Sequence, residues 1–206
     1  MKKFTCLVIA WMLCLTATAF AESVPSRMTG DMTAIEVEAE NLPADSGFFM
    51  KPVVEEDVEY QQRVDICNVE VEKLAASNDV ETYFGEITDY EGNTVSLKEM
   101  LGTETLNVFE FCPLIAGGYE ESYGKVIAKM IFSTPYEKDE KVVVMIGLVT
   151  SDENGVQTIR WIAYEGIGLG SVEGVTEEMG GIQVELDPEI VKAIEEGTAL
   201  LAIVSK

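Results

Sequence analysis

The segment 141–150 constrains the fold more than any other part of the chain. Its apolar side chains occupy both faces of an extended strand, with Val142, Val144, Ile146 and Leu148 on one face and Val143, Met145 and Val149 on the other. A strand of this kind belongs in the middle of a sheet that is covered on both sides. The segment 198–204 has the same two-sided pattern. We therefore expect a sheet that is buried on both faces.

Further strands are predicted where apolar residues alternate or cluster between turn residues. They are 35–39, 106–112, 125–132, 156–164 and 182–186. Pro113 is expected to end the strand before it, Asp152-Glu153-Asn154-Gly155 predicts a tight hairpin, and the glycine-rich segment 166–181 is expected to be a loop. The pattern predicts an α+β fold, mainly an antiparallel β-sheet with a sandwich-like core of about seven strands.

The periodicity changes to that of a helix between residues 55 and 76. Apolar residues recur there every three or four positions, at Tyr60, Val64, Cys67, Val71 and Leu74. This spacing predicts one long helix near the N-terminus, with acidic residues in its first turn and Cys67 facing the core.

Two short helices are predicted from their end signals. Ser96 and Glu99 have the spacing of a capping box, and Gly102 suits the end of the same helix. Asp187 and Pro188 suit the start of the other, which is expected to end at Gly197. As a crossover between strands, that second helix would allow one parallel strand pair.

The first residues have the order of a secretory signal peptide. A basic start at Lys2 and Lys3 precedes an apolar run, which ends in the small-residue sequence Ala19-Phe20-Ala21. The run is too short to span a membrane. We expect a signal peptide at 1–21, a flexible leader at 22–31 and a single secreted α+β domain at 32–206, located outside the cell or in its envelope.

The charge of the chain excludes several classes of partner. Its 37 acidic and 14 basic residues give a formal net charge of −23, and loss of Lys2 and Lys3 would make it −25. Such a charge repels nucleic-acid phosphates and anionic lipid headgroups, so we expect no nucleic-acid partner and no direct membrane binding. It is typical of a soluble extracellular protein, with loose cation binding or a basic partner as the alternative.

The chain contains no histidine. Ser-His-Asp and Cys-His catalysis are therefore excluded within it, and most catalytic zinc and copper sites lose their usual ligand. We expect no metal site and no cofactor. Cys67 and Cys112 follow the signal peptide, and the sequence leaves open whether they form one disulfide or two buried free thiols.

Glu110 is the one acidic residue whose setting suggests catalysis. It lies between Phe109 and Phe111 and is expected to share a strand face with Val108 and Cys112. A partly buried glutamate could act as a general acid in glycan hydrolysis, which needs a second carboxylate roughly 5–10 Å away. The sequence does not indicate which residue would supply this second carboxylate, and Glu110 could equally face solvent at a sheet edge.

Aromatic residues are the candidates for ligand binding. Trp161 alternates in phase with Ile159 and Ala163, which favours core packing over sugar stacking. Tyr119, Tyr123 and Tyr136 lie in or beside loops and are candidates for an exposed ligand or partner patch.

These observations favour a secreted, non-catalytic binding or protein-interaction domain, with an extracellular protein or a glycan as its partner. A carboxylate-based secreted glycan hydrolase is one alternative. A structural or assembly subunit at the cell surface, which associates with itself through a strand edge, is the other.

Processing of the N-terminus is the first testable expectation. We expect the exported protein to begin at Glu22, because the small residues Ala19 and Ala21 suit signal-peptide cleavage. N-terminal sequencing and intact mass of the exported protein check this. Ala21→Arg should leave the precursor uncleaved, and a wild-type chain that keeps its N-terminal 21 residues and stays inside the cell would contradict the expectation.

Overall fold

The computed structural model describes residues 32–53, 60–77, 79–132, 136–171 and 180–206. The strands are β1 (Met32–Ala39), β2 (Phe49–Pro52), β3 (Ile87–Thr88), β4 (Asn107–Gly117), β5 (Val126–Phe132), β6 (Lys141–Ser151), β7 (Gln157–Ser171), β8 (Gly180–Leu186) and β9 (Thr198–Ser205). The helices are α2 (Gln61–Ala76), α3 (Val80–Phe84), α4 (Leu97–Leu101) and α5 (Pro188–Glu196), with a short 3-10 helix η2 (Glu121–Tyr123).

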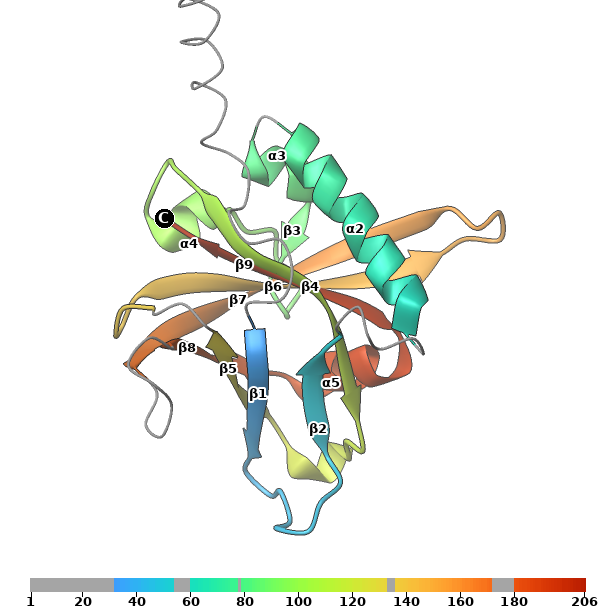
Figure 1. Ribbon diagram of the computed structural model, residues 1–206, viewed down its shortest axis with the longest axis vertical. Coiled ribbons are helices and arrows are strands. Elements are labelled where there is room, and N and C mark those ends of the chain that lie inside the picture. The colour runs from blue at the N-terminus through green and yellow to red at the C-terminus, as the bar shows by residue number, and fades with distance from the viewer. Residues whose placement is uncertain (1–31, 54–59, 78, 133–135, 172–179) are drawn as a thin grey trace, which may run out of the picture.

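The nine strands of the described residues belong to one sheet, in the order β1-β5-β8-β7-β6-β9-β4-β2, with β3 added to β7. Neighbouring strands along this path are antiparallel, and β3 pairs with β7 in parallel. The sheet curls into a nearly closed barrel, in which β1 and β2 lie side by side at the seam (Figure 1).

The predicted α+β class and the mainly antiparallel sheet are confirmed, whereas the sandwich-like core of about seven strands is wrong. A single curled sheet encloses the core instead of two stacked sheets. Alternating apolar residues do not separate these two architectures, because each of them buries one face of every strand. The short strands β2 and β3 were not predicted, because neither shows an alternating pattern.

Two large hydrophobic cores lie on opposite faces of the sheet, and a small third cluster joins Val53, Val64 and Ile115. The inner core fills the barrel, and the outer core lies under α2, α3 and α4 (Figure 1). The central strands β4, β6 and β9 contribute to both, and in β6 Val144 faces the inner core while Met145 faces the outer core. The expectation that segments 141–150 and 198–204 are buried on both faces is therefore confirmed.

Helix α5 closes the end of the barrel where β8 ends and β9 begins. Its buried residues Ile190, Val191 and Ile194 pack into the inner core. The helix begins after Asp187 and ends at Glu196, as predicted. However, β8 and β9 are not neighbours in the sheet, so the parallel pair that this helix would have allowed does not form. The helix covers a barrel end and not a sheet face.

The other two predicted helices are confirmed within the described residues. In α2, Val64, Cys67, Val71 and Leu74 are buried, as the spacing indicated. The acidic residues expected in its first turn fall in 54–59, outside the described residues. Helix α4 has Ser96 as its N-cap and Gly102, in the left-handed conformation, as its C-cap.

Strand β4 continues through Pro113, which was expected to end it. The Pro113 carbonyl accepts a hydrogen bond from the Val53 backbone N–H (2.9 Å), just beyond the end of β2. In a strand, the amide nitrogen and the carbonyl of one residue point to the same side. The nitrogen of Pro113, which carries no hydrogen, therefore points toward β2 and not toward β9, so the pairing of β4 with β9 loses no hydrogen bond.

The predicted glycine-rich loop is also wrong in its first part, because β7 runs to Ser171. Gly168 exchanges backbone hydrogen bonds with Asp139 and Glu140 (both 2.8 Å), and a Cβ at Gly168 would collide with the Glu137 carbonyl. Glycine is therefore required here because the backbone of residues 137–140 approaches closely. The last two residues of the expected loop, Gly180 and Gly181, begin β8, and residues 172–179 lie outside the described residues.

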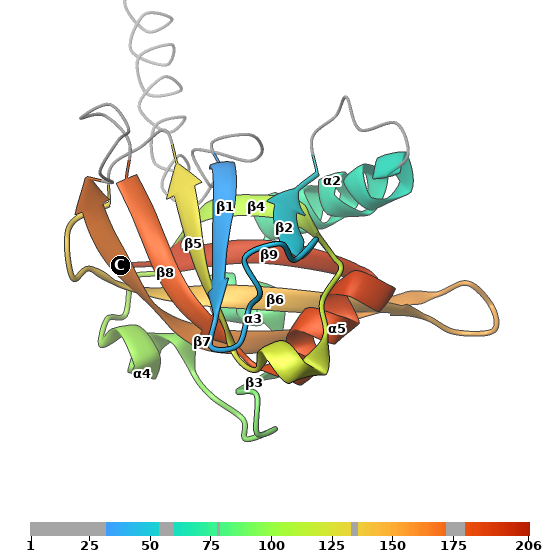
Figure 2. The ribbon, with the colours of Figure 1, turned by 90° about the horizontal axis from the view of Figure 1, so that it is seen from below.

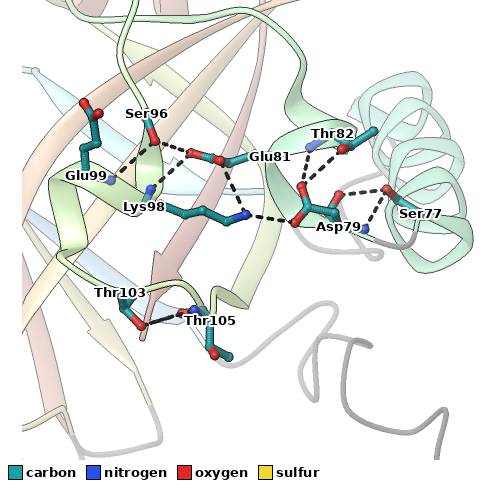
Figure 3. Close-up of polar contacts among 9 residues, drawn as sticks. All are labelled: Ser77, Asp79, Glu81, Thr82, Ser96, Lys98, Glu99, Thr103 and Thr105. Carbon is teal, nitrogen blue, oxygen red and sulfur yellow. Dashed lines mark hydrogen bonds and ion pairs between the residues drawn. The ribbon is translucent and has the colours of Figure 1, made fainter.

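A polar cluster, here called the Glu81 clamp, joins α3 to α4 (Figure 3). The Glu81 carboxylate accepts hydrogen bonds from Ser96 Oγ (2.6 Å) and from the Lys98 backbone N–H (3.1 Å). The Lys98 ammonium forms ion pairs with Asp79 (3.4 Å) and Glu81 (3.8 Å). Asp79 in turn caps α3 by accepting from the Thr82 N–H (2.9 Å).

The clamp holds the chain on either side of β3. Ile87 is buried in the outer core, pairs with Trp161 of β7, and accepts a hydrogen bond from the Val95 N–H (3.0 Å). Residues 89–93 therefore form a tight turn between two anchored strand segments. This turn carries Tyr90, which is 53% exposed.

The clamp predicts a pH-dependent contribution to stability. Although burial raises the pKa of Glu81, hydrogen bonds from Ser96 and Lys98 and the Lys98 charge together lower it below its ordinary value of 4.5. We expect Glu81→Gln to reduce the free energy of unfolding by about 1 kcal/mol at pH 7, as measured by urea denaturation.

The sign of the pH effect follows from linkage. A group whose pKa is lower in the folded state than in the unfolded state stabilises the fold at pH values above its unfolded-state pKa. This stabilisation is lost as the pH falls through its folded-state pKa. The difference between wild type and Glu81→Gln should therefore vanish on acidification below the ordinary value of 4.5. Glu104→Gln, at an exposed position, is the control. A difference that stays constant with pH would contradict this account.

Candidate functional site

Glu110 is buried inside the barrel, with 1% of its surface exposed. It pairs with Ile203 and faces the inner core on the same side as Cys112. Val108 faces the outer core, because the β4–β9 register shifts between Val108 and Glu110. The prediction that Glu110 and Cys112 share a face is confirmed. The prediction that Glu110 and Val108 share a face is wrong, because the sequence carries no signal for the register shift between them.

Two thiols, those of Cys67 and Cys112, lie close enough to Glu110 to feel its charge. Its charge raises the pKa of both Cys67 and Cys112, although burial is the larger cause for each. A thiol does not supply the second carboxylate that glycan hydrolysis requires. Within the part of the chain that the structure describes, no cluster of acidic or cysteine side chains is arranged to hold a metal ion.

Both cysteines are free and buried. Cys67 lies in the outer core, with its Sγ 3.7 Å from the Phe111 carbonyl oxygen, and Cys112 lies in the inner core. The possible disulfide is absent because the two side chains lie on opposite faces of β4. Burial raises the pKa of Cys67 to about 12 and that of Cys112 well above its ordinary value, so neither has the thiolate character of a reactive cysteine.

The tyrosines expected to form an exposed patch are buried. Tyr119, Tyr123 and Tyr136 are 9%, 7% and 9% exposed and belong to the inner core. Tyr119 packs against Phe48 with ring centroids 5.4 Å apart, and Tyr136 packs against Phe132 at 5.2 Å. Their expected exposure is wrong because the segments that carry them fold over the inner core.

Trp161 packs in the outer core, as favoured by the sequence. It is 3% exposed and meets Phe84 edge to face, with ring centroids 4.9 Å apart. It borders a hollow of about 420 Å³ between α2, α3 and β7. The buried carboxylate there, Glu70, is already bound by Lys73 (2.6 Å) and the Tyr83 hydroxyl (3.0 Å), which indicates a structural role.

A second hollow, here called the α5 hollow, has a volume of about 520 Å³. It is lined by residues of the turn after β3, the helix η2 and the start of α5. Figure 2 shows the ribbon that carries α5 and β3. The lining residues of the hollow are Tyr90, Glu121, Asp187, Pro188, Glu189, Ile190 and Lys192. Segments distant in sequence thus meet in a concave surface that combines an aromatic ring, an aliphatic side chain and charged groups.

Tyr90 is the large aromatic residue that this hollow exposes, with 53% of its surface accessible. Its ring stacks on Tyr164, with centroids 6.5 Å apart and planes inclined by 16°. The turn is fixed by hydrogen bonds from Asn93 to the Asp89 carboxylate (2.8 and 2.9 Å) and by Gly92 at φ 88°. The backbone that carries the exposed ring is therefore fixed, and the ring itself lies against Tyr164.

The charged groups around the hollow are paired with one another. Lys192 binds Glu121 (2.8 Å), and Lys125 binds Glu185 (2.8 Å) and Asp187 (3.5 Å). The hydrogen bond from Lys192 lowers the pKa of Glu121, and the hydrogen bond to Glu185 raises that of Lys125. The Lys125 ammonium also lies 5.7 Å from the centroid of the Tyr90 ring.

Sequence reasoning missed this site. The segment 89–93 reads as a turn, and the one available signal was an aromatic residue among polar turn residues. Neither the parallel pairing of β3 with β7 nor the approach of this turn to α5 is readable from sequence. None of the sequence-predicted candidates, Glu110, Tyr119, Tyr123, Tyr136 and Trp161, lines the α5 hollow.

Comparison with known proteins finds no matching family model, curated protein or solved structure. Among the described residues, no helix is both long enough and apolar enough to cross a membrane.

The cysteine geometry predicts two titratable thiols. In a chain that starts at Glu22, we expect Cys67 and Cys112 to resist a thiol reagent in the native state and both to react after denaturation without reductant, because both are buried and free. Cys67→Ser should leave one reactive thiol. An unfolded wild-type chain without reactive thiols would show that a disulfide forms and would contradict the structure.

Proposed function

We propose that this protein is an extracellular, non-catalytic binding domain and that the α5 hollow is its ligand site. The observation that carries the proposal is the half-exposed Tyr90 ring, fixed on Tyr164 at a concave surface. Ligand sites are typically concave and combine apolar contact area with a few polar groups. The predicted signal peptide at 1–21 and the strongly acidic composition support an extracellular location.

The rigidity of the ring is what favours binding over a merely exposed side chain. An aromatic residue that is already ordered loses little conformational entropy when a ligand contacts it. Tyr90 is ordered by its stacking and by the Asp89–Asn93 turn, and the turn is anchored through Ile87 in the outer core. The fold thus supports a preorganised contact surface.

The alternatives have less support. A glycan hydrolase would need Glu110, whose carboxylate lies within the inner core beside thiols. An assembly subunit would use the edge strand β1, whose exposed Glu36 and Glu38 are the kind of charged side chains that oppose pairing between copies. The binding role is therefore the proposal that the geometry favours.

Fragment binding followed by NMR tests the proposal. The ¹⁵N-labelled chain from Glu22 is titrated with neutral sugars, small amines and small carboxylates. We expect one class to shift the amides of Tyr90, Glu189 and Ile190, because these residues border the hollow.

Val156→Ala is the matched control, because Val156 is 58% exposed on the β6–β7 hairpin, outside the hollow. This substitution should leave the shifts unchanged, whereas Tyr90→Ala should abolish them. Absence of any shift at the hollow for all three classes would refute the binding role.

A further inference from the structure

We infer that the ligand of the α5 hollow is a neutral sugar ring of a glycan, which lies against the exposed part of Tyr90. This inference rests on the proposed function and names its ligand class. It follows from the charges around the hollow, which disfavour anions and leave the main cation position occupied.

An anionic ligand is disfavoured by the lining itself. Glu121, Asp187 and Glu189 outnumber the one lysine of the lining, Lys192. That lysine is already bound to Glu121 (2.8 Å). A phosphate, sulfate or carboxylate would enter a field of net negative charge on a protein whose formal net charge is −23.

A cationic ligand meets a different obstacle. The position that a cation takes near an aromatic ring is held by Lys125, 5.7 Å from the Tyr90 centroid. Lys125 is fixed there by Glu185 (2.8 Å) and Asp187 (3.5 Å), which are the carboxylates that a ligand ammonium would need. An incoming amine would have to displace this internal cation from both partners.

A neutral polyhydroxylated ligand can use the same groups without breaking the ion pairs. The side chains of Glu121 and Lys192 are 72% and 47% exposed, so the carboxylate retains lone pairs and the ammonium retains N–H groups that face solvent. Sugar hydroxyls can donate hydrogen bonds to the Glu121 carboxylate and accept them from the Lys192 ammonium. The C–H groups of a sugar ring supply the apolar surface that contacts an aromatic ring.

The dimensions and the rigid ring agree with this ligand. About 520 Å³ lies within the usual range for small-ligand sites, roughly 300–1,000 Å³. The Tyr90 hydroxyl donates its hydrogen to Glu91 (3.1 Å), so it has no hydrogen left to donate to the ligand, and we expect the ring to make the main contact. This predicts that phenylalanine replaces Tyr90 in binding and alanine does not.

The test measures binding of neutral oligosaccharides by NMR titration and calorimetry. The probes are hexaoses of glucose in α-1,4 and β-1,4 linkage and of N-acetylglucosamine, with spermidine and citrate as the charged probes. We expect at least one hexaose to bind at the hollow. Tyr90→Ala should weaken it by about tenfold or more, and Tyr90→Phe and the control Val156→Ala should change it by less than about twofold.

Salt dependence provides an independent readout of ligand charge. Affinity for a neutral glycan should change by less than about twofold between 0.05 and 0.5 M salt, whereas binding of a charged ligand weakens with salt. Shifts at the hollow with spermidine or citrate alone would overturn the glycan inference and leave the binding function intact. Glycan binding that survives Tyr90→Ala would overturn the inference, and no shift with any probe would overturn both proposals.

Discussion

Burial of both faces of β4, β6 and β9 is the constraint on which the rest of this structure depends. One face of these strands closes around the inner core, and the other must be covered from outside the barrel. Apolar burial contributes roughly 25 cal/mol per Å², so leaving Met145, Leu200 or Val204 uncovered would be costly. The segment between β2 and β4, which carries α2, α3, β3 and α4, provides this cover.

The position of the candidate site follows from how the segment between β2 and β4 is held against the sheet. Because β3 pairs with β7 beyond the point where β8 diverges, the turn after β3 emerges beside the end of β8 and the start of α5. The Glu81 clamp ties the two sides of this turn together. Tyr90 therefore inherits its rigidity from the hydrophobic core and the clamp, although its own side chain is half exposed.

The sequence was informative where a local pattern has one physical meaning. The two-faced pattern of 141–150, the buried face of α2 and the caps at Ser96 and Asp187 were all predicted. It was uninformative where long-range geometry decides, as in closure of the barrel, the bulge beside Glu110, and the strand that continues through Pro113. Tyr119, Tyr123 and Tyr136 were misassigned because position beside a loop does not determine exposure.

Native-state hydrogen exchange tests the two-sided burial most directly. The account predicts that amides of Val143–Ile146 and Leu200–Ile203 exchange only by global unfolding, with a free energy of exchange equal to that of unfolding. Val95, whose amide binds the Ile87 carbonyl beneath the cover, should be strongly protected as well. Rapid exchange of the central β6 and β9 amides through local opening of the outer layer would contradict the account.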